Sequence, residues 1–182
     1  MATGRHPQNN PQPGPQSPHG DRNRVPVQAV GLNPDELKVL ETLRLFCIAY
    51  ADPASMAWEQ AFETCTREFG PTCGPRIGMA TMKVMSALRI SRRTTYSFTN
   101  PACSCCRHTL SDHELQMMSL LKAQRRGDGL ARQTHAVILC EGQRPERFLA
   151  SMESLADCLN DLAKSTHPKQ TSLQKKRIRF SQ

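Results

Sequence analysis

Three cysteines and two histidines lie close together in residues 101–113, the part of this sequence with the most specific chemistry. Cys103, Cys105 and Cys106 are followed by His108 and His113. Thiolates and imidazoles are the ligands that zinc prefers, and the spacing Cys103-x-x-Cys106 lets a tight loop present two sulfurs to one ion. The pattern therefore predicts a metal site in a cysteine-rich loop, residues 101–113.

Zinc usually takes four protein ligands in a structural site, so further ligands are needed. We expect Cys103 and Cys106 to bind zinc with help from Cys140 and from either His113 or Cys105. The candidate metal ligands are Cys103, Cys105, Cys106, His113 and Cys140. An iron–sulfur cluster is the alternative cofactor, because it is also held by thiolates, although the spacing matches neither of the common ferredoxin patterns.

The same cysteines support a second hypothesis, a thiol-based redox switch or a thiol enzyme that uses the Cys103–Cys106 loop. Closely spaced thiols can form a disulfide, and both Arg107 and the following helix N-terminus would lower a thiol pKa. A third interpretation is that these cysteines only pack. The sequence contains no glycine-rich phosphate loop, nucleophile elbow or His-Glu-x-x-His motif, so no catalytic residue is assigned.

A second candidate site is a helix-turn-helix that would bind DNA. Two helical stretches, at about residues 53–69 and 75–90, are joined by Gly70-Pro-Thr-Cys-Gly74, and the second stretch is basic. Arginines on such a helix can contact guanine and phosphate in the major groove, whereas the simpler interpretation is a solvated helix face. The candidate nucleic-acid-binding residues are Arg76, Lys83, Arg89, Arg92 and Arg93.

Apolar residues at helical spacing predict the elements that must position these side chains. Helix starts are marked at Asn33-Pro34-Asp35-Glu36 and at Ser111-Asp-His-Glu114, the second of which has the form of a capping box. Residues 94–99 are rich in threonine and aromatic residues, which favours an extended segment or a short edge strand. We expect a mainly α protein, a compact bundle of about six helices with at most one short strand.

The net charge of +8 is concentrated near the ends of the sequence. Residues 164–182 hold four Lys, two Arg and no acidic residue, whereas residues 32–163 hold fifteen basic and fifteen acidic residues. Residues 1–31 are rich in Pro, Gln and Asn and contain few large apolar side chains, which is typical of disorder. The sequence predicts a disordered tail at 1–31, a helical domain at 32–163 and a basic flexible tail at 164–182.

No apolar stretch approaches the roughly 20 residues of a membrane-spanning helix, and no secretory signal is evident. We therefore expect a cytoplasmic protein that does not bind membranes, in which the eight cysteines are reduced rather than paired in disulfides. The combined prediction is a zinc-binding regulatory or adaptor protein whose partner is nucleic acid or another protein.

Overall fold

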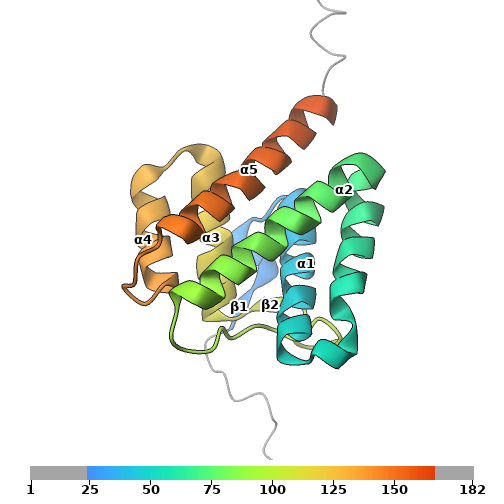
Figure 1. Ribbon diagram of the computed structural model, residues 1–182, viewed down its shortest axis with the longest axis horizontal. Coiled ribbons are helices and arrows are strands. Elements are labelled where there is room, and N and C mark those ends of the chain that lie inside the picture. The colour runs from blue at the N-terminus through green and yellow to red at the C-terminus, as the bar shows by residue number, and fades with distance from the viewer. Residues whose placement is uncertain (1–23, 167–182) are drawn as a thin grey trace, which may run out of the picture.

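In a computed structural model, which describes residues 24–166, the chain forms five α-helices and one small sheet (Figure 1). The helices are α1 (Pro34–Ala51), α2 (Ala57–Ser91), α3 (Asp112–Arg126), α4 (Gly129–Leu139) and α5 (Glu146–Thr166). Two 3-10 turns, η1 (Val27–Val30) and η2 (Pro53–Ser55), precede α1 and α2. The predicted mainly helical fold is confirmed for the described residues. Most of the two predicted tails, 1–31 and 164–182, lies outside them.

The predicted count of about six helices is corrected to five, because the helices expected at about 53–69 and 75–90 are merged in α2. The first of them begins later than expected, at Ala57, because Pro53–Ser55 form the separate turn η2. Gly70 is the non-helical residue inside α2, with φ 80° and ψ 165°. Pro71 follows it directly, and proline fits the first position of a helix, where no backbone donor is needed. The expected five-residue linker is therefore a sharp bend at Gly70.

The apolar faces of the helices enclose one core. Fully buried side chains come from α1, α2, α3 and α5, among them Phe46, Leu88, Met117 and Phe148. The second segment of α2 runs beside α5 in the opposite direction, and α3 and α4 form a neighbouring hairpin (Figure 1). Burial of these apolar surfaces is the main force that holds the helices together.

A small antiparallel sheet joins the start of the described chain to the cysteine-rich loop. Strand β1 (Val25–Pro26) pairs with β2 (Thr109–Leu110), so two short strands are present rather than at most one. Ordered structure thus begins within the predicted tail 1–31. The pairing of β1 with β2 connects these first residues to the end of the candidate metal-binding loop.

Residues 94–99, expected to be an extended segment or edge strand, are not part of the sheet. Their backbone donors bind side chains instead. The Ser97 N–H donates to Nδ1 of His113 at 2.8 Å, and the Thr99 N–H donates to Oε1 of Glu114 at 3.2 Å. Side chains of α3 therefore accept hydrogen bonds that the backbone of a neighbouring strand would accept in a sheet.

No helix within residues 24–166 combines the length and the apolar character needed to cross a bilayer.

Candidate functional site

The cysteine-rich loop folds into a compact turn. The Asn100 side chain accepts a hydrogen bond from the Ala102 N–H at 2.9 Å, which starts the turn. The Arg107 N–H then donates to the carbonyl of Cys103 at 3.0 Å, and the Thr109 N–H donates to the carbonyl of Cys106 at 2.9 Å. These bonds wind the backbone tightly enough to bring closely spaced side chains together.

Three of the predicted ligands converge in this turn. The Sγ atoms of Cys103, Cys105 and Cys106 all lie within 4.8 Å of one another. The Cys103 and Cys105 sulfurs are 3.1 Å apart, and the Cys105 and Cys106 sulfurs are 3.5 Å apart. Among the residues that the structure describes, this is the one group of three or more metal-binding side chains close enough to share an ion.

The three thiols differ in exposure and in acidity. Cys105 is exposed and Cys103 half-buried, whereas Cys106 is 8% exposed. Hydrogen bonds from Cys105 and Cys106 lower the pKa of Cys103 to about 7. Interaction with the other two thiols, together with desolvation, raises the pKa of Cys106 to about 11. Hydrogen bonds within the cluster thus favour the thiolate at Cys103, and a thiolate is the form that binds metal.

A buried arginine on α1 anchors the end of the loop. Arg44 Nη1 donates to the carbonyl of Arg107 at 2.7 Å, and Nη2 donates to the carbonyl of Thr109 at 2.6 Å. Its Nε also forms an ion pair of 2.7 Å with Oε1 of Glu114 on α3, and the two side chains are 5% and 2% exposed. Because Arg44 binds backbone carbonyls on both sides of His108, it fixes the path of the chain directly after the cysteines.

The N-terminal strand provides a second anchor. The Val27 N–H donates to the carbonyl of His108 at 2.9 Å, next to the pairing of β1 with β2. The cysteine cluster is therefore connected through hydrogen bonds to α1, to α3 and to residues 25–27.

The other two predicted ligands, His113 and Cys140, are not in the cluster. His113 lies between the Ser97 N–H, 2.8 Å from Nδ1, and Arg92, whose Nη2 is 3.1 Å from Nε2. Its ring also stacks on Tyr96, with 5.4 Å between ring centroids. Cys140 is fully buried, and burial is the main cause of its raised pKa. The structure thus brings together three of the five predicted ligands.

The five basic residues predicted to bind nucleic acid occupy different environments. Arg76, Lys83 and Arg93 are exposed. The Arg89 guanidinium covers the Tyr50 ring at 4.1 Å from its centroid. The Arg92 side chain is only 3% exposed and pairs with Glu141 at 3.0 Å. The five side chains therefore do not form one continuous face.

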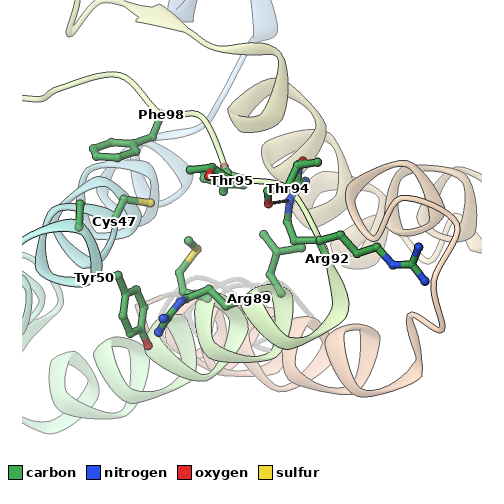
Figure 2. Close-up of a pocket in the computed structure, with 12 residues that line it drawn as sticks. Cys47, Tyr50, Arg89, Arg92, Thr94, Thr95 and Phe98 are labelled. Carbon is green, nitrogen blue, oxygen red and sulfur yellow. Dashed lines mark hydrogen bonds between the residues drawn. The ribbon is translucent and has the colours of Figure 1, made fainter.

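Sequence patterns gave no indication of a pocket of about 300 Å³ between α1, the second half of α2 and residues 93–98. Figure 2 shows Cys47 and Tyr50 of α1, Arg89 of α2, and Thr95 and Phe98 of the extended segment around it. Burial raises the pKa of the Cys47 thiol, which favours its protonated form in this pocket.

Arg44 and Glu141 are the residues that sequence analysis overlooked. A signal was present for Arg44, because it lies four residues after Leu40 and therefore on the apolar side of its helix. A charge at such a position requires a buried partner. Glu141 gave no comparable signal, because its contacts to Arg92 and to residues 93–94 join segments more than forty residues apart in sequence.

Comparisons with protein-family models, with curated proteins and with solved structures gave no match for this chain.

Proposed function

We propose that this chain is a small regulatory protein that binds zinc through Cys103, Cys105 and Cys106. The observation that carries the proposal is the convergence of the three Sγ atoms to within 4.8 Å of one another. Thiolate sulfur is a soft ligand that selects zinc over the hard ions magnesium and calcium. Cys103, whose pKa is about 7, is the thiol most readily available as a thiolate.

The sulfur spacing suits a zinc ion after small side-chain movements. A tetrahedral zinc with Zn–S bonds of about 2.3 Å holds its sulfurs about 3.8 Å apart. The Cys103–Cys105 and Cys105–Cys106 sulfur pairs are 3.1 and 3.5 Å apart. They would therefore separate by about 0.7 and about 0.3 Å. Three thiolates leave the fourth zinc position to solvent or to another molecule, as in zinc sites that keep an open position.

Zinc binding would influence the rest of the chain through the contacts that hold the loop in place. Zinc would fix the turn at Cys103–Cys106, whose continuation binds Arg44 and pairs with β1. Because metal binding restricts the loop, it would stabilise these two contacts as well. The metal state of the loop would thereby control the ordering of residues 25–27.

The test is zinc binding by the full-length, reduced protein in competition with a chromophoric chelator. We expect about one zinc per wild-type chain and loss of this zinc in Cys103→Ser/Cys106→Ser. Cys158→Ser is the matched control, because Cys158 is a half-buried cysteine on α5 outside the cluster. The proposal is wrong if the wild type binds no zinc, or if the double variant binds zinc as tightly as the control does.

A second candidate function, a thiol redox switch, is favoured by the 3.1 Å separation of the Cys103 and Cys105 sulfurs. Glutathione disulfide would accept two electrons and become two glutathione molecules, while the two thiols lose two protons and form a disulfide. Intact-mass measurement distinguishes the two functions. A switch gains the disulfide in the metal-free protein, whereas a zinc site prevents this oxidation when zinc is bound.

A further inference from the structure

Two hollows lie along the junction between α5 and the second segment of α2, which run side by side (Figure 1). The first, of about 390 Å³, has a mostly apolar lining that includes Pro75, Met79 and Ala80. Arg76 and Lys83 of α2 and Ser154 of α5 also line it. The second, of about 580 Å³, is bordered by Arg93 after α2 and by Arg144 and Arg147 at the start of α5. Both hollows are therefore edged by positive charge.

We name the surface formed by these five side chains the basic groove, which consists of Arg76, Lys83, Arg93, Arg144 and Arg147. All five are exposed, and none forms a hydrogen bond or ion pair through its side chain with another described residue. Glu146 is the one acidic residue that lines either hollow. Arg92 also borders the second hollow, but its charge is balanced by Glu141.

Exposed positive charges that cluster on one surface attract anions. Their spread along the junction of the two helices favours an extended anionic ligand. From Arg76 to Ile90, α2 rises about 20 Å at 1.5 Å per residue. One strand of a nucleic-acid duplex presents a phosphate about every 3.4 Å along its axis, so this length faces about six phosphates. An isolated phosphate or carboxylate would use only one end of the groove.

The lining residues also distinguish duplex from single-stranded nucleic acid. No aromatic side chain borders either hollow, and proteins that bind single strands stack bases on aromatic rings. We propose that the basic groove binds the phosphate backbone of a nucleic-acid duplex without reading its base sequence. Phosphate contacts of this kind position a protein on a duplex but carry no sequence information.

This site differs from a helix-turn-helix. The side of α2 that bears Arg76 and Lys83 borders α5, so α2 cannot enter a major groove alone. Arg89 is excluded because it covers Tyr50, and Arg92 is excluded because it is buried with Glu141. Arg144, just before α5, and Arg147, in its first turn, are added from a segment more than fifty residues later in the sequence than Lys83.

The test is a titration of a labelled 20-base-pair DNA duplex with full-length protein at several salt concentrations. In Arg93→Gln/Arg144→Gln/Arg147→Gln we expect the dissociation constant to rise by about tenfold or more. The salt slope, which is the change in log K per unit of log salt concentration, should become smaller in magnitude by about 2.7, corresponding to three lost phosphate contacts. When Arg76→Gln and Lys83→Gln are combined with these three substitutions, the magnitude of the salt slope should fall further. The matched control, Arg67→Gln/Arg126→Gln/Lys164→Gln, removes the same charge from exposed positions outside the groove.

Several results would overturn the proposal. One is that the wild type does not bind the duplex, and another is that the control loses as much affinity and salt slope as the groove variant. Tighter binding of the single strand that also depends on the groove would contradict the duplex assignment. Binding of polyglutamate as tight as that of DNA would identify an acidic protein as the ligand instead.

Discussion

At the level of single residues, the candidate metal site depends most on a buried ion pair that contains no metal ligand. Arg44 and Glu114 are almost completely buried, and Arg44 also holds the carbonyls of Arg107 and Thr109. Glu114 in turn accepts hydrogen bonds from the N–H groups of Thr99 and Ser111. Both segments that flank the cysteines are therefore attached to one pair of charges.

Removal of the arginine should strongly destabilise the fold. In Arg44→Met, the Glu114 charge stays buried without its counterion and two carbonyls lose their donors, so we expect a loss of about 3–5 kcal/mol. Urea denaturation measures this loss. Asp161→Asn, which removes an exposed ion pair with Lys164, is the control and should change stability by about 0.5 kcal/mol or less. A loss below about 1 kcal/mol in Arg44→Met would contradict the role assigned to this pair.

His113 should make stability depend on pH near neutrality. Burial and then the charge of Arg92 lower the pKa of His113 below its ordinary value of 6.5. The unfolded chain therefore binds this proton more readily than the folded chain does. The contribution of His113 is complete above pH 6.5 and decreases as the pH falls below that value.

The comparison that isolates this effect is wild type against His113→Gln, with the free energy of unfolding measured from pH 7.5 to pH 5. The wild type should lose stability relative to the variant as the pH falls, because only the wild type gains a proton at residue 113 on unfolding. Parallel curves for the two proteins would show that His113 is not held in its neutral form by the fold.

At the level of secondary structure, the sharp bend in α2 is enforced by two glycines. Gly70 adopts φ 80° and ψ 165°, a region of backbone space that is essentially restricted to glycine. Gly74 is required for a different reason. A Cβ at this position would lie 2.4 Å from the carbonyl oxygen of Cys65 and 2.5 Å from Cα of Thr66.

Alanine at either glycine should therefore destabilise the protein, by about 1–3 kcal/mol in each case. Gly129→Ala is the matched control, because a Cβ at Gly129 meets nothing within 4 Å and its backbone needs no positive φ. That variant should be neutral or more stable by up to about 1 kcal/mol. Thermal unfolding of the three variants provides the comparison, and equal midpoints would refute the account of the bend.

The starts of α1 and α3 were predictable from sequence because their signals are local. The capping boxes of α1 and α3, with Asn33–Glu36 and Ser111–Glu114, follow from residues three apart. The bend at Gly70 was mistaken for a five-residue linker, because Pro71 and Pro75 resemble loop residues although both lie within α2. The cysteine cluster was predictable for the same reason as the helix caps, because its three cysteines are neighbours in sequence.

Contacts between distant segments could not be predicted from these patterns. Threonine and aromatic content favoured an extended segment or a short strand at residues 94–99, but side chains of α3 accept the hydrogen bonds of the Ser97 and Thr99 N–H groups. Similarly, nothing in the spacing indicated that Arg144 and Arg147 lie beside the end of α2. These arrangements depend on how the helices pack, which the sequence specifies only through the whole core.

At the level of the whole molecule, the loop that holds the cysteine cluster is hydrogen-bonded to the start of the described chain. If zinc stabilises the turn, it should slow hydrogen exchange at the Val27 amide, which binds the carbonyl of His108. The Leu149 amide of α5, which donates to the carbonyl of Pro145, serves as the internal control and should be unaffected. Equal protection of the Val27 amide from exchange with and without zinc would show that zinc binding does not stabilise the N-terminal strand.

The most direct test of the central claim is zinc K-edge X-ray absorption of the zinc-loaded, full-length protein, which counts the ligands and their distances. The account predicts three sulfur ligands at about 2.3 Å and one nitrogen or oxygen ligand at about 2.0–2.2 Å. Replacement of one sulfur by a lighter atom in Cys105→Ser would identify the exposed member of the cluster as a ligand. A site with only nitrogen and oxygen ligands, or a spectrum unchanged by Cys105→Ser, would contradict the claim that this cluster binds zinc.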